Sequence, residues 1–346
     1  MLPKISIITP SFNQGDYMEQ TILSVLNQGY PNLEYIIVDG GSKDHTVALI
    51  KKYESRISFW VSEPDKGQTD ALNKGFKKAT GDIVNWINSD DYYAGQCLFQ
   101  VADSFRDPKV QAVTTTVRNF EEGGAEWNEL TPRCSGNAAY IARAFNNQPG
   151  TFFRKEVWDR YFPMPPQLRY TMDQYLWFCY WLENKVEGFK TETYTTVNFR
   201  RHALSKTSNS LGDLVFNTLG KVFFNEHNLI FWSYFHWADP LKAAVVAGYF
   251  WDNFDYRKNV ISFPPHIKFD AVMAEKIFQL YLFQLLKEDY RLGFFDRLRQ
   301  HIGCLKAEYF SPAEKGQIEK MRFRAARPLV VKAYRNVFWK INNFFK

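Results

Sequence analysis

Short apolar runs alternate with amphipathic stretches along roughly the first hundred residues of the chain. The runs at 5–8, 35–38 and 83–87 are rich in β-branched residues, and the run at 59–61 is Phe-Trp-Val. Such apolar runs are typical of strands buried on both faces of a parallel sheet. Between them, apolar residues recur at helical spacing across 18–25, 47–53, 69–79 and 98–105. This β-α-β-α order predicts a mainly parallel sheet flanked by helices, with all strands ending on one edge, where ligands bind.

The pattern changes after about residue 110. A strand-like run at 113–117 precedes Gly123-Gly124, which indicates a hairpin or turn. A helix is predicted over 172–184, after a proline-rich break. From residue 216 to the C-terminus, aromatic and aliphatic residues recur at helical spacing, which predicts a mostly α-helical appendage.

Composition and charge narrow the class of protein only slightly. A length of 346 residues predicts two parts or one enlarged domain. The aromatic content of 17% supplies ample core material, and it also suits surfaces that stack on sugars or meet a membrane. A net charge of +6 fits an anionic partner such as a nucleotide diphosphate or an acidic lipid headgroup, but is too weak to predict nucleic-acid binding.

The cysteine pattern and the N-terminus indicate a cytoplasmic location. The four cysteines are scattered and form no C-x-x-C pair, so neither a zinc site nor a disulfide framework is expected. The N-terminus resembles no signal peptide, and no apolar stretch reaches the roughly 18 residues of a membrane-spanning helix.

Polar residues follow each of the four predicted strands. They are Thr9 to Asn13, then Asp39, then Glu63 to Gly67, and then Asn88 to Asp91. A single acidic loop is most often a solvated loop, but four strands that deliver acidic or hydroxyl groups to one edge are hard to explain by packing. The sequence therefore predicts a ligand site at this edge.

The adjacent carboxylates Asp90 and Asp91 need a positive partner, because two such groups at the end of a buried strand repel each other. Mg²⁺ or Mn²⁺ accepts carboxylate ligands and keeps positions open for phosphate oxygens. Such a cation would stabilise a departing diphosphate. The alternative is that Asp91 caps the next helix.

Four segments carry a more specific signal. They are Ile-Ile-Thr-Pro-Ser-Phe-Asn at 7–13, Ile-Ile-Val-Asp-Gly-Gly-Ser-Lys-Asp-His-Thr at 36–46, Ser-Glu-Pro-Asp-Lys-Gly-Gln-Thr-Asp-Ala-Leu-Asn-Lys-Gly at 62–75, and Gly-Asp-Ile-Val-Asn-Trp-Ile-Asn-Ser-Asp-Asp at 81–91. In this order they resemble glycosyltransferase family 2, over roughly residues 4–205. The resemblance implies an α/β protein with the GT-A (Rossmann-like) fold, whose sheet is mixed and mainly parallel. It also implies an inverting enzyme that moves a sugar from a nucleotide-sugar to a hydroxyl acceptor.

The resemblance sets the expected domain limits. Residues 1–212 would form the catalytic domain, with 1–105 as its nucleotide-sugar-binding half and 106–212 as its acceptor-side half. Residues 213–346 would form the helical, aromatic-rich and basic C-terminal region. The expected partners are a UDP-sugar and a glycan or lipid-linked acceptor, as in polysaccharide or cell-surface glycan synthesis.

Roles for the nucleotide side follow from the same resemblance. Thr9 and Pro10 should line the nucleotide pocket, and Asp39 should hydrogen-bond the base, usually uracil. Asp65 and Lys66 should approach the nucleoside.

The resemblance also assigns the donor sugar and the metal. Asp70 and Asn73 lie one helical turn apart, so both can face the donor sugar or the metal motif. Asp91 is the expected direct ligand of Mn²⁺ or Mg²⁺, with Asp90 nearer the ribose or sugar. Gly150 should permit close backbone approach to the donor sugar.

The segment at 170–177 resembles the one that carries the catalytic base, which falls on Asp173. Many relatives have Glu-Asp here, whereas this chain has Met172-Asp173. A helix N-terminal acid that interacts with the helix dipole is the alternative for Asp173.

Basic residues follow the base segment. His202 matches a histidine that related enzymes supply to the metal, although a lone histidine is as often a surface or core residue. Arg200, Arg201 and Lys206 could neutralise the diphosphate.

The C-terminal stretch at 320–346 contains lysines, arginines and aromatic residues and no acid. This pattern predicts binding to an anionic membrane surface, at the inner face of the cell membrane. The alternative is a helix that packs its aromatic side on the catalytic domain.

Two rival functions remain. A sugar nucleotidyltransferase also uses paired aspartates on an α/β sheet, but its Gly-rich, Arg-containing loop after the first strand is absent here. The second rival is a catalytically inactive module that binds a nucleotide-sugar, against which Asp39, Asp91 and Asp173 argue.

Overall fold

The computed structural model describes residues 2–131, 134, 136–143, 147–184, 186–202, 205 and 218–326. Its first half contains β1 (Ile5–Ser11), α1 (Gly15–Leu26), β2 (Leu33–Asp39), α2 (Thr46–Lys52), β3 (Phe59–Ser62), α3 (Gln68–Lys78), β4 (Ile83–Trp86), β5 (Tyr92–Tyr93) and α4 (Cys97–Ser104). Next come β6 (Ala112–Glu121), β7 (Glu126–Glu129), α5 (Asn137–Arg143), β8 (Thr151–Arg154), α6 (Lys155–Trp158), α7 (Met172–Glu183) and β9 (Phe189–Arg201). The last elements are α8 (Thr218–Ala238), α9 (Pro240–Ala247), α10 (Ala271–Leu292), α11 (Phe295–His301) and α12 (Pro312–Ala326).

A single mixed sheet organises the first two hundred residues. Within the described ranges it has nine strands in the order β3-β2-β1-β4-β8-β6-β9-β5, and β7 pairs with β6. Strands β3, β2, β1 and β4 are parallel, while β8 runs antiparallel to both of its neighbours. Ser11 lies opposite Asp39, and Asp39 lies opposite Ser62. The strands therefore end together on one edge, and the predicted mainly parallel α/β sheet is confirmed.

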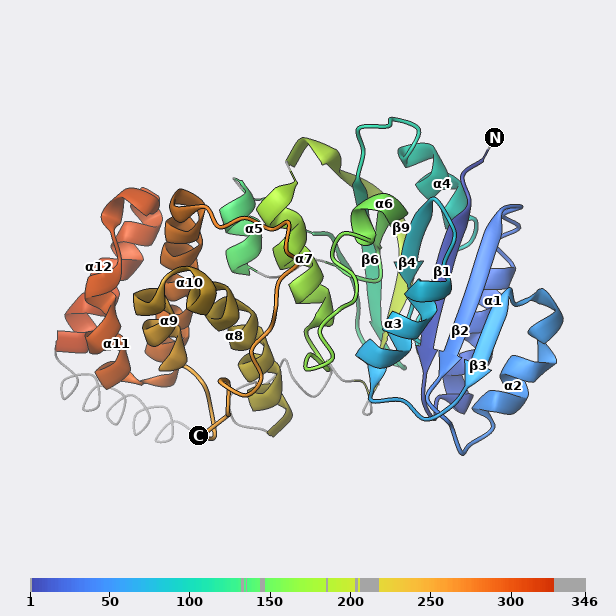
Figure 1. Ribbon diagram of the computed structural model, residues 1–346, viewed down its shortest axis with the longest axis horizontal. Helices are drawn as coiled ribbons and strands as arrows, with labels where there is room; N and C mark the ends of the chain where they lie inside the picture. Colours follow the sequence, from blue (N-terminus) through green and yellow to red (C-terminus); the bar gives the residue numbers. More distant parts are fainter. Residues whose placement is uncertain are drawn as a thin grey trace, which may run out of the picture.

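Each face of the sheet is covered by helices. Alternating side chains send Ile5 and Ile7 into a core with α1, α2 and α4, and Ile8 and Val84 into a core with α3, α6 and α7. Figure 1 shows α3 and α6 in front of the strands. A parallel sheet buried on both faces explains the nearly continuous apolar runs of β1, β2 and β4.

The helical appendage predicted from the sequence is present as α8 to α12. It lies at the end of the molecule opposite β3, with α5 and α7 between (Figure 1). Asp239 caps α9 by accepting hydrogen bonds from the backbone N–H groups of Leu241 and Lys242, and Asp270 caps α10 through the N–H of Met273 at 2.7 Å. Gly293, at φ 83°, ends α10 in the left-handed conformation.

Aromatic side chains join the appendage to the sheet domain. The ring of Phe178 in α7 meets that of Phe231 in α8 at 5.1 Å, and Phe231 stacks on Tyr281 of α10 at 3.6 Å. These rings belong to the same buried cluster as Ile8 and Val84. The two regions therefore share one core, and most of the aromatic residues serve it, as composition suggested.

Some sequence predictions fall outside the described residues. These are the proposed domain boundary at 212/213, the basic group of Lys206 and the membrane-binding stretch from residue 327 onward. Among the helices that the structure describes, none is long and apolar enough to cross a membrane.

Substitution of Trp158 tests the contribution of the core beneath the sheet to stability. Trp158 is buried, stacks on Phe76 at 4.0 Å, and meets Trp86 and Phe153 edge-on at 5.5 and 5.6 Å. Its Nε1 has no hydrogen-bond partner within the described part of the chain. We expect Trp158→Ala to lower the free energy of unfolding by about 3–5 kcal/mol, and Trp158→Phe to cost much less because it removes no hydrogen bond. Denaturant unfolding of both variants measures this, and equal losses would contradict it.

Candidate active site

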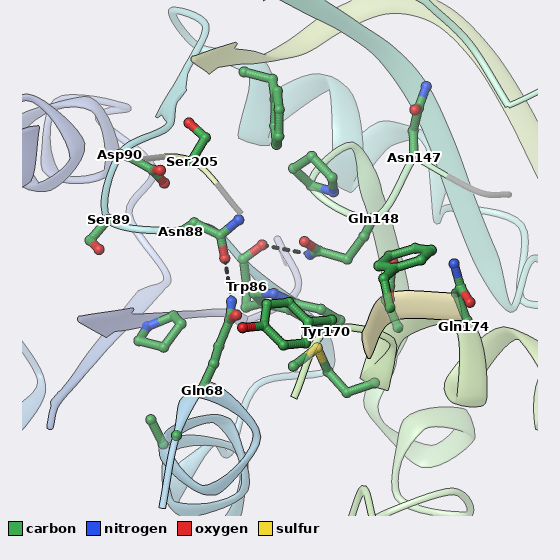
Figure 2. A pocket seen from close by; sticks show the side chains of 18 of the residues that line it. Gln68, Trp86, Asn88, Ser89, Asp90, Asn147, Gln148, Tyr170, Gln174 and Ser205 are labelled. Carbon is green, nitrogen blue, oxygen red and sulfur yellow. Dashed lines mark hydrogen bonds between the residues drawn. The ribbon is translucent and has the colours of Figure 1, made fainter. Parts of the chain in front are cut away.

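A cavity of about 930 Å³ opens at the edge where β1 to β4 end. One side is formed by the turns after these strands, and the other by the start of α7 and the first half of α8. In Figure 2, Asp90 and Gln174 lie at opposite sides of the pocket, with Trp86 and Tyr170 between them. The predicted ligand edge therefore holds a pocket.

The turn after β2 is held by the buried carboxylate of Asp39. It accepts hydrogen bonds from the N–H groups of Gly41 (3.1 Å) and Ser42 (2.9 Å) and from the Ser62 hydroxyl (2.6 Å). Gly40 lines the cavity, and a Cβ on it would lie 2.7 Å from Oδ2 of Asp65. Asp39 thus fixes the turn, and its contact with a base stays a prediction.

The other four nucleotide-side residues differ in their position relative to the cavity. Pro10 and Asp65 line it, and burial raises the pKa of the Asp65 carboxyl. Thr9 is buried behind Pro10, where its hydroxyl shares a hydrogen bond with Tyr35 at 3.1 Å. The exposed Lys66 is not among the residues that line the cavity.

Asp70 and Asn73 are not among the residues that line the cavity, and their contact with the donor stays a prediction. The Asn73 amide donates to the carbonyl of Met164 at 2.9 Å and accepts from its N–H at 3.0 Å. Asp70 accepts from the N–H of Lys66 at 3.2 Å and lies 3.5 Å from Lys74. Helix α3 uses these side chains to anchor neighbouring loops.

The two adjacent aspartates have opposite environments. Asp91, the expected direct ligand, is only 1% exposed, and its Oδ1 accepts the backbone N–H of Arg200 at 2.9 Å. Burial and the Asp90 carboxylate raise the pKa of Asp91 well above its usual value. Asp90 is the carboxylate that lines the cavity. The capping alternative also fails, since α4 begins only at Cys97.

Arg200 supports this turn from the side away from the cavity, and its contact with the donor stays a prediction. Its guanidinium donates to the carbonyl of Asp90 (3.1 Å), to Glu122 (2.5 Å) and to Gln20 (2.5 Å). Arg201, by contrast, lines the cavity. It lies 4.8 Å over the ring of Trp127, and its buried Nε has no hydrogen-bond partner among the described residues.

A divalent cation fits the donors at this corner. His202 Nε2 lies 3.1 Å from Oδ2 of Asp90, and an imidazole beside a carboxylate is a donor set that suits Mn²⁺. No group of three or more His, Cys, Asp and Glu that could hold a metal occurs in the described ranges. The other coordination positions would therefore belong to oxygens of the ligand and to water.

Gly150 has a packing role at the start of β8. A Cβ there would lie 2.7 Å from Val117 and 3.0 Å from Thr115, so close packing requires the glycine. The neighbouring Gln148 and Pro149 line the cavity instead of Gly150, and Gln148 donates to the carbonyl of Trp86 at 3.0 Å (Figure 2).

Asp173 lies in the first turn of α7 and lines the cavity, as expected of a base. Burial raises the pKa of its carboxyl to about 6, and the charge of Glu226 adds to the increase. Glu226 belongs to α8, and its Oε2 accepts the N–H groups of Arg169 (2.9 Å), Tyr170 (2.8 Å) and Thr171 (3.2 Å). The appendage therefore holds the backbone that enters the helix of Asp173.

Several cavity residues had no role assigned from the sequence. They are Gln68, whose amide donates to Asn88 at 2.8 Å, together with Tyr170, Gln174, Phe223, Phe224 and His227. The last three come from α8. Their signal was the polar run at 225–228 inside an otherwise aromatic and aliphatic helix.

Comparison with known proteins agrees with this arrangement. The family model described as glycosyl transferase family 2 matches residues 6–165. An uncharacterized glycosyltransferase of Mycobacterium tuberculosis strain H37Rv is 42% identical over 94 residues, 27% of this chain and 36% of the relative. The putative teichuronic acid biosynthesis glycosyltransferase TuaG of Bacillus subtilis is 42% identical over 92 residues, 26% of this chain and 36% of the relative. The matches thus span about a third of the relatives' length.

Among solved structures, S. aureus TarS 1–349 in complex with UDP-GlcNAc superposes with a TM-score of 0.59. The sequence identity is 15%, over 96% of this chain and 92% of that chain. The likeness shows a GT-A fold. Residues 6–165 of the chain therefore match glycosyltransferase family 2.

Glu226 offers a test of how the appendage supports Asp173. Glu226→Gln keeps an oxygen that can accept the three N–H groups but removes the negative charge. We expect the pKa of Asp173 to fall below about 6 in this variant, because a neighbouring negative charge favours the protonated carboxyl. A ¹³C titration of the Asp173 carboxyl measures the shift.

Glu226→Ala serves as the companion variant. It leaves three buried N–H groups without their acceptor, so we expect a loss of about 1–3 kcal/mol of stability. An unchanged Asp173 titration in Glu226→Gln, together with wild-type stability in Glu226→Ala, would contradict a positioning role.

Proposed function

We propose that this protein is an inverting glycosyltransferase that moves a sugar from a UDP-sugar to a hydroxyl acceptor in glycan synthesis. The observation that carries the proposal is one cavity lined by both Asp173, a carboxylate of raised pKa, and Asp90, whose carboxylate contacts the imidazole of His202. TarS, which has the same fold, binds UDP-GlcNAc, and this supports a UDP-sugar donor. The teichuronic acid role given to TuaG supports a glycan product.

The donor diphosphate belongs at the Asp90 corner. Asp90 and His202 would hold a divalent cation, which neutralises the leaving diphosphate when bound. Arg201 adds a positive charge at the cavity wall, which favours an anionic ligand. Asp91 acts through its buried contact with Arg200, which fixes the turn that presents Asp90.

The nucleoside belongs between the turns after β1 and β2. Pro10, Gly40 and Asp65 line this part of the cavity, and Gly40 leaves room for close approach. Asp39, which closes the turn, fixes the backbone that would meet the base.

Asp173 supplies the base. In its ionised form the carboxylate accepts the proton of an acceptor hydroxyl as that oxygen attacks the anomeric carbon. The leaving diphosphate departs from the opposite face, so a single displacement inverts the anomeric centre. A pKa near 6 leaves the group ionised at neutral pH while keeping it a better base than an exposed aspartate.

Peripheral membrane binding through residues 320–346 stays part of the proposal on sequence grounds. Within the described part of that stretch, Phe323 is exposed and carries two basic neighbours, Arg322 and Arg324, on α12.

Thermal shift with UDP tests the donor site. We expect UDP with Mn²⁺ to raise the melting temperature, because a ligand that binds only the folded state stabilises it. We expect Asp90→Asn to weaken UDP binding in the presence of Mn²⁺ by at least about tenfold, equal to about 1.4 kcal/mol. The exposed Asp103→Asn on α4 is the matched control and should bind as the wild type. Equal UDP affinity in Asp90→Asn and the control would contradict the assignment.

The pH profile tests the base. Because the ionised form of Asp173 is needed, the transfer rate should fall as pH drops through about 6. Asp173→Asn should retain UDP binding and lose transfer, whereas an inactive binding module would show no transfer in either protein. A rate that keeps rising below pH 6, or an active Asp173→Asn enzyme, would contradict the role of Asp173.

A further inference from the structure

The first turn of α7 and the middle of α8 meet at a hydrogen-bonded pair. Oε1 of Gln174 lies 2.5 Å from Nδ1 of His227, and both residues line the cavity. Gln174 follows Asp173 directly in the chain, and Figure 2 shows it on the side of the pocket away from Asp90. The pair therefore lies beside the proposed base rather than beside the donor diphosphate.

The pair offers one donor and one acceptor to a ligand. If Nδ1 of His227 donates to Oε1 of Gln174, the ring Nε2 keeps a lone pair and the amide Nε2 keeps its N–H groups. If the amide is turned round and donates to Nδ1, the ring Nε2–H becomes the donor and the amide oxygen the acceptor. Within the described residues, neither Nε2 of His227 nor the remaining polar atom of the Gln174 amide has another hydrogen bond. Both arrangements therefore leave one donor and one acceptor side by side.

The surroundings keep this pair uncharged. Burial lowers the pKa of His227 to about 4, so the ring is neutral at pH 7. Its ring neighbours are Phe231 at 5.1 Å and Tyr281 at 5.5 Å. The adjacent carboxylate of Glu226 is engaged with the backbone at 169–171. A neutral, polar group of this kind suits hydroxyls better than it suits an anion.

Aromatic side chains flank the pair on the cavity wall. Phe223 and Phe224 precede His227 by four and three residues, so all three share one face of α8. Tyr170 also lines the pocket, and Figure 2 shows it between Asp90 and Gln174. Aromatic faces beside a few fixed polar groups are the usual lining of a site for a small polar ring.

We propose that the corner of Gln174, His227, Phe223 and Phe224 is the acceptor subsite, and that the acceptor group it binds is a sugar ring. A hydroxyl both donates and accepts, so two adjacent ring hydroxyls match the donor and acceptor of the Gln174–His227 pair, while the C–H face of the ring meets the phenylalanines. A lipid alcohol or a serine side chain offers only one such group. The inference rests on the proposed function, because it takes Asp173 as the base for the bound sugar.

Saturation-transfer NMR tests the inference directly. The probes are the methyl pyranosides of glucose, galactose, mannose and N-acetylglucosamine, with N-acetylserinamide as the non-sugar hydroxyl, each with UDP and Mn²⁺ present. The variants are Gln174→Leu and His227→Phe, which remove the polar groups and keep most of the volume. The matched control is His301→Phe, a buried histidine of the appendage that contacts Tyr249 at 3.1 Å and does not line the cavity.

We expect at least one pyranoside to bind the wild type and His301→Phe alike. Each pocket variant should bind it about 3- to 10-fold more weakly, as expected for the loss of one or two neutral hydrogen bonds. UDP affinity should stay within about twofold of wild type, since the pair is remote from the donor corner. If His227→Phe does not fold, Gln174→Leu carries the test, because its side chain is only partly buried.

Other results overturn the inference in distinguishable ways. The acceptor assignment is wrong, and the proposed function survives, in three cases in which UDP binds. These are that no pyranoside binds, that N-acetylserinamide binds in preference to the pyranosides, or that pyranoside binding is the same in all variants. If UDP itself does not bind the wild type, the proposed function fails and the acceptor assignment fails with it.

Discussion

The hydrogen bond from the backbone of Arg200 to the buried carboxylate of Asp91 links the end of β9 to the turn after β4. Two carboxylates in succession repel each other, and the low polarity around Asp91 strengthens this repulsion. In the structure, Asp91 is buried and accepts the backbone N–H of Arg200, while the Arg200 guanidinium donates to the carbonyl of Asp90. Thr21 adds a hydroxyl bond to the carbonyl of Asp91 at 2.6 Å. With Asp91 fixed from behind, Asp90 is left as the carboxylate in the cavity.

The sequence predicted this edge well, because strand order and strand ends are encoded locally. Apolar runs locate β1 to β4, and the parallel arrangement then brings the following polar residues together whatever their spacing in the chain. Which of two adjacent aspartates turns inward is a different kind of question. It depends on the Arg200 N–H, more than a hundred residues away, which motif position alone does not reveal.

The wall opposite the strand ends was missed for a related reason. Helical spacing in the C-terminal region reports only that α8 is a buried helix, and not which element it packs against. The run Asn225, Glu226, His227 and Asn228 is anomalous in such a helix, since buried polar groups require partners. Each has a hydrogen-bond partner that is distant in the sequence: Asn225 with Trp251, Glu226 with the backbone before α7, His227 with Gln174, and Asn228 with the carbonyl of Tyr249.

This polar run couples the appendage to the chemistry. Glu226 and His227 are consecutive residues of one helix, and the first supports the backbone of α7 while the second faces the cavity beside Asp173. A rigid helix that joins both contacts limits how far the base and the acceptor wall can move apart. Helix α8 shares its core with the sheet domain through Phe178 and Phe231, so the packing of that core also supports the helix that carries Asp173. The strand ends and the helical appendage thus carry the two sides of the proposed reaction, and the geometry between them depends on α7, which contacts both.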